Sequence, residues 1–216
     1  MNLSRSLAWI IITFTACSAP VPTDISREDV DLIVIKAVRI PDSQPWYSRF
    51  ADHCWIDFHE AGTDHWVRVE ANLDPDVWTI SSPIAFEQIR WDMDVEVLAL
   101  LQGKAAAECI PFIRSRAKEV AIDFEYRAFP GPNSNTYISR ILSGVPGLSA
   151  ELPHNSLGKN YTEIFSAGWT TSADGFYLDT LLLGVSLGYL QGIELHLIGL
   201  TAGISFWPPA IKLPIL

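Results

Sequence analysis

The sequence has little positive charge, and what it has is not clustered. Its 216 residues include 15 Lys and Arg against 25 Asp and Glu, which gives a formal net charge of −10. Nucleic acids and anionic lipid headgroups are bound by surfaces that concentrate Lys and Arg. We therefore expect no nucleic acid partner, and we do not expect anionic lipid to be the main partner.

Several motifs that identify enzyme classes are also missing. The sequence contains no phosphate-binding glycine loop, no dinucleotide fingerprint, no HExxH and no paired CxxC. These absences speak against nucleotide-dependent enzymes and the common zinc enzymes, and we expect no cofactor and no metal. The segment HCWIDFHEAGTDH, residues 53–65, is dense in His, Cys, Asp and Glu. It leaves a metal site open as an alternative.

Cysteine is scarce, with three residues in the whole chain. Three cysteines are too few for a disulfide framework in a chain of this length. Cys54 and Cys109 either form one disulfide in an oxidising compartment or are two buried free thiols. The sequence leaves both possibilities open.

Residues 1–16 have the pattern of a signal peptide. Arg5 is their only charged residue, and it precedes the apolar run LAWIIITFTA. A membrane-spanning helix needs about 20 apolar residues, so a run of roughly ten is typical of the core of a signal peptide. The run ends at FTAC, which resembles the bacterial lipobox, where the signal is cut before a cysteine that is then diacylated. An ordinary secretory signal or a short uncleaved anchor is the alternative.

The lipobox resemblance implies a cell-envelope protein attached to the membrane by a lipid on Cys17. Residues 17–30 are mostly small and polar and include two prolines, so we expect them to form a flexible tether. A single globular domain is expected over residues 31–216. By the same resemblance, the lack of an acidic residue after Cys17 favours the outer membrane, facing the periplasm, if the cell is Gram-negative.

The remaining chain predicts an α+β fold, in which an antiparallel sheet packs with two or three helices. Four segments have the composition and alternation of strands: 31–40, 53–61, 65–73 and 95–103. The second and third are expected to form a hairpin. Helices are predicted over 104–120, where Pro111 should kink or split the helix, and from about Asn133 to Gly144.

The most apolar region is GFYLDTLLLGVSLGYLQGIELHLIGLTAGISF, residues 175–206. Polar and apolar residues alternate in IELHL and again in LTAGISF, which predicts a C-terminal β-hairpin packed on the core. Two GxxxG spacings, at Gly184 and Gly199, are typical of packed membrane helices and leave a membrane-inserted segment as an alternative. Glu194 and His196 would be costly at the centre of such a segment.

The segment PGPNSNTY, residues 130–137, contains a candidate catalytic residue. Asn133 and Ser134 are both good N-caps for the helix that follows. A side chain at this point lies among free backbone amides at the positive end of the helix dipole. Ser134 is therefore either a helix cap or a nucleophile whose oxyanion the amides near Asn133–Asn135 would stabilise.

A serine nucleophile needs a base, and His53 is the best candidate among five histidines. It begins a predicted strand, on the face opposite Cys54, Ile56 and Phe58. Glu70, on the neighbouring predicted strand, is placed to orient His53, with Asp57 as its competitor. A surface contact without function is the alternative. His59 and His65 are expected at the surface, His154 in a loop and His196 as a paired strand residue.

Five segments together resemble an uncharacterised bacterial family, domain of unknown function 3750: DHCWIDF, PGPNSNTY, LGKNY, GIELHLIGLTAGI and WPPAIKLP. The resemblance extends from about Ala37 to Leu213. It implies no activity, because the family has none assigned.

The order of the candidate residues also resembles the circularly permuted papain-like hydrolases and acyltransferases related to the NlpC cell-wall peptidases. In that family a strand histidine precedes an Asn-Cys pair that opens a helix. The resemblance places the pair on Asn133 and Ser134, the histidine on His53 and the third polar residue on Glu70, with serine in place of cysteine. It implies a papain-like architecture acting on an amide or ester in the envelope, or a non-catalytic protein of the same fold that binds a peptide, ester or lipid.

Overall fold

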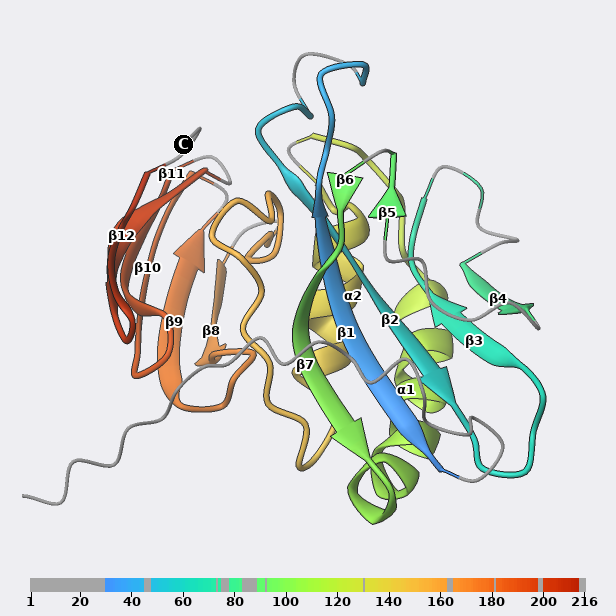
Figure 1. Ribbon diagram of the computed structural model, residues 1–216. Helices are drawn as coiled ribbons and strands as arrows, with labels where there is room; N and C mark the ends of the chain where they lie inside the picture. Colours follow the sequence, from blue (N-terminus) through green and yellow to red (C-terminus); the bar gives the residue numbers. More distant parts are fainter. Residues whose placement is uncertain are drawn as a thin grey trace, which may run out of the picture.

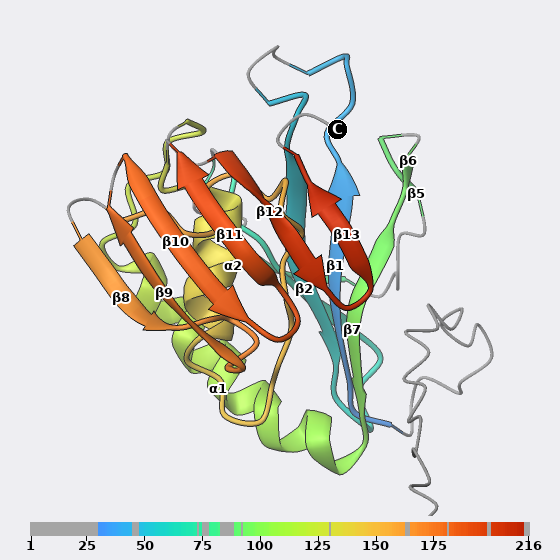
Figure 2. The same cartoon turned by 90° about the vertical axis from the view of Figure 1, so that its left-hand side faces the viewer.

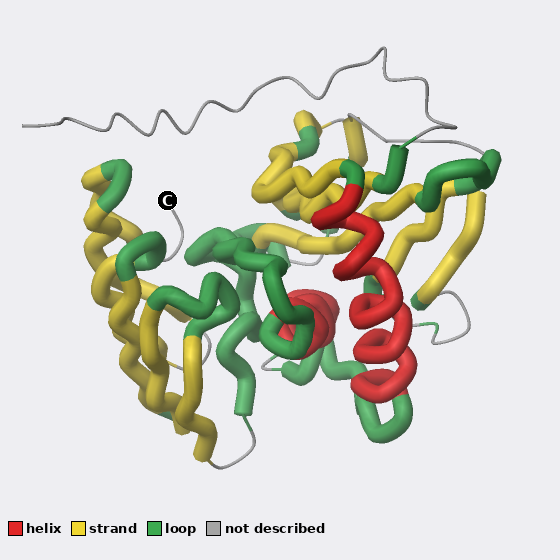
Figure 3. The backbone as a smooth tube through the Cα atoms, turned by 90° about the horizontal axis from the view of Figure 1, so that it is seen from below, coloured by secondary structure: helices red, strands yellow, loops and turns green. Residues whose placement is uncertain are grey.

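The computed structural model describes residues 30–44, 48–72, 74, 78–82, 89–91, 93–129, 131–162, 165–180, 182–197 and 200–213. The expected signal peptide, Cys17 and nearly all of the expected tether lie outside these residues. Two large antiparallel sheets lie on either side of helix α2 (Ser134–Leu142), as Figures 1 and 3 show. The described residues contain two helices, and the predicted α+β class with antiparallel pairing is confirmed.

The first sheet has the strand order β4-β3-β2-β1-β7, and all neighbouring strands in it are antiparallel. Its strands are β1 (Leu32–Arg39), β2 (Asp52–His59), β3 (Trp66–Val69), β4 (Thr79–Ser82) and β7 (Glu96–Gln102). The predicted hairpin of residues 53–73 is formed by β2 and β3. A small two-stranded ladder of β5 (Ile89–Arg90) and β6 (Met93–Asp94) precedes β7.

Helix α1 (Lys104–Ala121) continues past Pro111, so of the two predicted effects, a kink or a split, the split does not occur. Proline removes one backbone hydrogen bond from a helix interior. Its neighbours Ile110 and Ile113 are buried in the core, and burying a side chain of this size contributes about 1.5–3 kcal/mol. Packing of the apolar face therefore holds the helix together across the proline.

The core lies between the first sheet and the two helices. Because side chains alternate along a strand, Ile33 and Ile35 of β1 face the helices together with Cys54, Ile56 and Phe58 of β2. Tyr137 of α2 packs edge-on against Phe124 and tilted against Trp78, and its hydroxyl donates to the Ala117 carbonyl. Burial raises the pKa of Tyr137 to about 12. This packing fixes α2 against β2 and thereby places the first residue of the helix.

The other face of the first sheet buries charge. Asp57 of β2 accepts from Lys36 Nζ at 2.9 Å, and from Arg68 Nε at 2.8 Å and Nη2 at 3.0 Å. The Trp55 indole also donates to this carboxylate, at 3.1 Å. Lys36 is fully buried and Asp57 nearly so. Such a group is stable because each charge has a partner and its hydrogen bonds are made.

His59 was expected at the surface, and this prediction is wrong. The side chain is buried, with Nδ1 3.1 Å from the Val30 carbonyl oxygen and Nε2 2.9 Å from that of Thr63. The local pattern places His59 beside a turn, but the chain just before β1 covers it. Contacts between distant segments of this kind are not visible in the local sequence.

The second sheet has the strand order β13-β12-β11-β10-β9-β8, which Figure 2 shows from its outer side. Its strands are β8 (Phe165–Trp169), β9 (Gly175–Thr180), β10 (Leu183–Gly188), β11 (Gly192–Leu197), β12 (Leu200–Phe206) and β13 (Pro209–Lys212). The predicted C-terminal hairpin exists as β11 and β12, which pair at Leu197 and Leu200. It is part of a much larger sheet.

The polarity of this second sheet is the reverse of what we expected. Its buried inner side carries Asp179, Ser186, Glu194 and His196, while its outer side carries large exposed apolar residues. The hairpin was expected to pack on the core, but its apolar residues face outward. Among the residues that the structure describes, no helix is long and apolar enough to cross a membrane.

We predict that Asp57→Asn strongly destabilises the protein. The substitution leaves two buried or half-buried cations without the carboxylate that neutralises them, and removing one member of such a group costs about 3–5 kcal/mol. Urea unfolding followed by tryptophan fluorescence measures the loss. Glu108→Gln is the matched control, because Glu108 pairs with Lys104 at the exposed surface and such pairs contribute little. Equal stability of the two variants would contradict this assignment.

Candidate functional site

The structure brings His53, Ser134 and Glu70 together. The Ser134 hydroxyl oxygen lies 3.0 Å from His53 Nδ1, and His53 Nε2 lies 3.0 Å from Glu70 Oε2. All three residues are buried, with 6–8% of their surface exposed. They come from three separate segments, since His53 is the second residue of β2, Glu70 follows β3, and Ser134 begins α2.

The two contacts assign the protons of the imidazole. An ionised carboxylate accepts hydrogen bonds and cannot donate them, so the contact with Glu70 requires a proton on His53 Nε2. In the neutral ring, Nδ1 is then the acceptor and faces the Ser134 hydroxyl, which donates. In that neutral state a ring nitrogen with a lone pair points at the serine, and the contact with the carboxylate favours this tautomer.

The side chain of Asn133 caps the helix that carries Ser134. Its Oδ1 accepts from the Asn135 amide at 3.1 Å and the Thr136 amide at 3.3 Å, while Thr136 Oγ1 accepts from the Asn133 amide. Its Nδ2 donates to the carbonyls of Ala128 and Leu157. The cap predicted for this segment is thus supplied by Asn133, and the Ser134 hydroxyl is left to face His53.

The side chain of Asn135 ties the helix start to β2. Its Oδ1 accepts from the Cys54 amide at 3.0 Å, and its Nδ2 donates to the Asp52 carbonyl at 2.7 Å and the Leu157 carbonyl at 3.0 Å. These bonds enclose His53 on both sides along the strand. They explain how residues 81 positions apart are held within hydrogen-bonding distance.

The amide donors around Ser134 are mostly in use. The backbone amides of Asn133 and Asn135 donate to side chains within the cap, and both asparagine side-chain amides donate to carbonyls. Within the described part of the chain, the Ser134 amide makes no hydrogen bond. It is the donor best placed for an oxyanion, at the positive end of the helix dipole.

Two tryptophans border the histidine, and no sequence motif marks either of them as part of the site. Trp55 stacks on the His53 ring with centroids 5.7 Å apart, and Trp91 lies at the same distance with its ring tilted by 50°. Trp91 has a positive φ of 53° between β5 and β6, and 39% of its surface is exposed. No local motif marks Trp91, because its position depends on how the β5–β6 ladder returns to β2.

The other residues considered for the candidate site make their contacts elsewhere. Asp57 is held by Lys36 and Arg68, so Glu70 is the carboxylate that meets His53. Cys54 and Cys109 are free, buried thiols and do not pair. The described residues contain no group of three His, Cys, Asp or Glu arranged to hold a metal ion. Although residues 53–65 are rich in His, Cys, Asp and Glu, these side chains make separate contacts instead of forming one group.

A second serine and histidine lie close together in the second sheet. Residues 184–188 read GVSLG, a GxSxG pattern, and Ser186 Oγ lies 3.5 Å from His196 Nε2. GxSxG activates a serine at a sharp turn between strand and helix, whereas Ser186 is inside β10. Burial lowers the pKa of His196, but its bonds to Asp179 and Glu194 raise it by more. Because Ser186 does not stand at such a turn and His196 already contacts two carboxylates, this arrangement lacks the geometry of a GxSxG nucleophile.

The comparisons with known proteins identify a family. The family described as "Protein of unknown function (DUF3750)" matches residues 33–161, which include all three residues of the candidate site. The chain belongs to this family. No curated protein and no solved structure matches the chain.

We predict that Cys54 is inert in the native protein although it adjoins His53. Burial raises the pKa of the Cys54 thiol to about 12, and its sulfur lies 3.2 Å from Ser156 Oγ. Iodoacetamide at pH 8 should leave Cys54 unmodified until urea unfolds the protein, as measured by mass spectrometry of the peptides. Rapid modification of native Cys54 would show that this part of β2 is open to solvent.

Proposed function

We propose that this DUF3750 protein is a hydrolase or acyltransferase that acts on an amide or ester group in the cell envelope. Ser134 is the nucleophile, His53 the general base and Glu70 the residue that orients His53. The observation that carries the proposal is the pair of 3.0 Å contacts that place His53 between Ser134 and Glu70. The proposal includes a papain-like architecture, supported by the order of strand histidine, carboxylate on the next strand and nucleophile at a helix start.

The reaction follows from the positions of the protons. As Ser134 Oγ attacks the substrate carbonyl carbon, its proton passes to His53 Nδ1, and Glu70 stabilises the resulting imidazolium through Nε2. The carbonyl oxygen becomes an oxyanion that accepts a hydrogen bond from the Ser134 amide. His53 then gives the proton to the departing alcohol or amine, which leaves an acyl group on Ser134. Water or a second acceptor releases that group by the same steps in reverse.

Serine in place of cysteine makes the base essential. A hydroxyl is far less acidic than a thiol, so Ser134 needs a base in direct contact, whereas a thiol at this position would ionise more easily. The close contact between Oγ and Nδ1 supplies that base. The exposed Trp91 borders the site and is placed to contact the substrate.

The proposed location is the envelope, through a lipid on Cys17. This part of the proposal is supported by the sequence pattern of residues 1–17 alone. In a Gram-negative cell, the lipid would hold the domain at the outer membrane, facing the periplasm. Incorporation of a labelled fatty acid that disappears in Cys17→Ser tests it.

We predict that a fluorophosphonate probe labels the protein at Ser134. The probe reacts with serines that an adjacent base activates, so Ser134→Ala and His53→Ala should abolish labelling. Glu70→Gln should reduce the rate by at least an order of magnitude, because the imidazole loses its orientation and charge partner. Gel fluorescence and peptide mass spectrometry measure the rate and the site.

Ser143→Ala is the matched control. Ser143 follows α2, is exposed, and donates to the Arg140 carbonyl; its loss should leave labelling unchanged. If folded wild-type protein resists the probe, the site is not a serine nucleophile, and the same residues form a non-catalytic binding site.

We also predict that Ser134→Cys produces a reactive thiolate. A cysteine beside an imidazole at a helix N-terminus has a lowered pKa, so this thiol should react with iodoacetamide near pH 6, where Cys54 and Cys109 do not. Adding His53→Ala should move the reaction to higher pH. An unchanged pH profile would mean that His53 does not act on residue 134.

A further inference from the structure

The outer side of the second sheet carries a continuous apolar surface. One row of residues in register crosses all six strands: Trp169, Phe176, Leu187, Ile193, Ile204 and Ile211. Each of the six has 44–76% of its surface exposed. A neighbouring row includes Leu178, Val185 and Leu195, which are also exposed. We call these two rows the outer apolar face; Figure 2 views the sheet from this side.

This face is comparable in size to the largest apolar patch of a typical soluble protein. Aromatic side chains such as those of Trp169 and Phe176 have about 150–250 Å² of surface each, so six large side chains that are half exposed present on the order of 500 Å². The largest patch on a typical monomer is about 300–600 Å² and is often functional. The first row alone reaches this range, and the second extends it.

Buried ion pairs on the inner side of the sheet determine which residues of each strand face outward. Glu194 pairs with Lys159 at 3.4 Å and with Lys212 at 2.5 Å, and Asp179 pairs with His196 at 2.5 Å. Shifting a strand by one residue would exchange its two sides, but it would also break these buried ion pairs. The outer apolar face is therefore a consequence of the register that the charges enforce.

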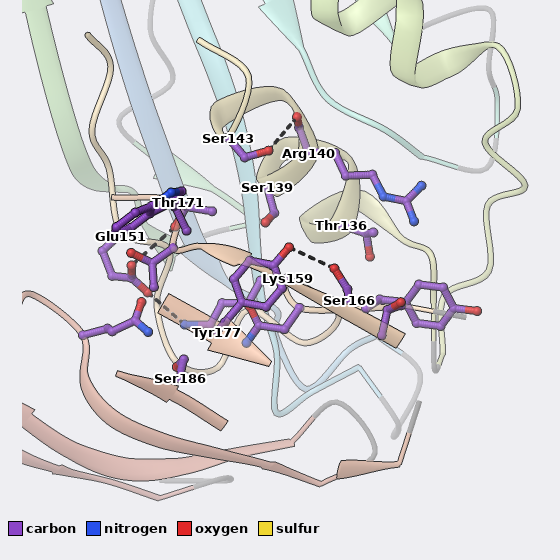
Figure 4. Close-up of a pocket in the computed structure, with 16 residues that line it drawn as sticks. Thr136, Ser139, Arg140, Ser143, Glu151, Lys159, Ser166, Thr171, Tyr177 and Ser186 are labelled. Carbon is purple, nitrogen blue, oxygen red and sulfur yellow. Dashed lines mark hydrogen bonds and ion pairs between the residues drawn. The ribbon is translucent and has the colours of Figure 1, made fainter. Parts of the chain in front are cut away.

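The inner side also borders a polar cavity of about 170 Å³ between the sheet and α2. Figure 4 shows Ser139 and Arg140 of α2 on one side of it, and Tyr177 and Ser186 of the sheet on the other. Lys159 and Glu151 pair at its edge, at 3.1 Å. The inner side of the sheet is thus lined by polar groups. The apolar residues of these strands therefore lie on the outer side.

We propose that the outer apolar face docks on the hydrocarbon boundary of a lipid bilayer. A protein partner would usually form about one hydrogen bond per 100–200 Å² of interface, but the outward positions of β9–β11 are apolar except for Thr180. A bilayer needs no such partners. Trp169 lies at the β8 edge with 71% of its surface exposed, and tryptophan is enriched where proteins meet the membrane interface.

The length of chain before the described residues fits this occupant. Val30 lies thirteen positions after Cys17, and at about 3.3–3.6 Å per residue this span reaches at most about 47 Å. Here the inference rests on the proposed lipid anchor: an acylated Cys17 would keep Val30 within that distance of the bilayer, and the domain that carries the face would stay beside the membrane. Docking then needs no recruitment from solution.

A probe at residue 195 tests the proposal. Leu195→Cys, in the second row, carries an environment-sensitive fluorophore; the full chain is purified from membranes and reconstituted into phosphatidylcholine vesicles. We expect a blue shift and a severalfold loss of quenching by a water-soluble quencher. The same fluorophore on Glu108→Cys, which is on the exposed side of α1, should stay in water. Because the chain has a net charge of −10, anionic lipid should not strengthen the burial and high salt should not reverse it.

Three results would overturn the proposal. One is a water-exposed residue-195 probe on protein that floats with the vesicles. Another is burial only with anionic lipid. The third is burial without vesicles in a protein that sediments as a dimer, which would assign the face to a second copy. Flotation and the mass of the Cys17 peptide report the anchor separately, so failure of the anchor and failure of the face give different results.

Discussion

The segment of residues 157–160 connects the candidate site to the second sheet, and much of the structure depends on it. The Leu157 carbonyl accepts from the side chains of Asn133 and Asn135, and the Gly158 carbonyl accepts from Thr136 Oγ1 at 2.6 Å. Gly158 has a φ of +86°, and a β-carbon there would lie 2.5 Å from the Asn133 side chain. Only glycine lets the cap and this loop approach so closely.

The side chains of the next two residues, Lys159 and Asn160, contact the second sheet instead of the candidate site. Lys159 is buried and pairs with Glu151 and Glu194, while the Asn160 amide contacts His196. Burial lowers the pKa of Lys159, but Glu194 and Glu151 raise it by more, so it stays charged. Four consecutive residues therefore position the start of α2 and also hold the polar side of the second sheet inward. The apolar outer side follows from the same contacts.

The sequence predicted four strands of the first sheet (β1, β2, β3 and β7) but not β4, and it predicted both helices and the three residues of the candidate site. Alternation and helix caps are local signals, and His53, Glu70 and Ser134 each lie at the start or end of an element where such signals are strong. The structure brings these three side chains together, and their chemistry is what the proposal adds. Positions that depend on contacts between distant segments were missed, as His59 and Trp91 show.

The second sheet was only partly predicted, because alternation shows that a strand has two sides without showing which is inside. We assumed that the apolar side packs on the core. The ion pairs of Glu194 with Lys159 and Lys212 decide otherwise, and they join residues too far apart in the sequence to be recognised as a group. Tertiary packing also decides the outcome at Pro111, where the buried apolar face of α1 outweighs the tendency of proline to break a helix.

The proposed chemistry requires that His53 presents an unprotonated Nδ1 to Ser134 while Glu70 holds its Nε2 proton. Nitrogen NMR of ¹⁵N-labelled histidine distinguishes the two tautomers of the His53 ring directly. We expect the Nε2–H tautomer in the wild-type protein near neutral pH, with this preference weakened in Glu70→Gln. A His53 ring that carries its proton on Nδ1, and so donates to Ser134, would contradict it.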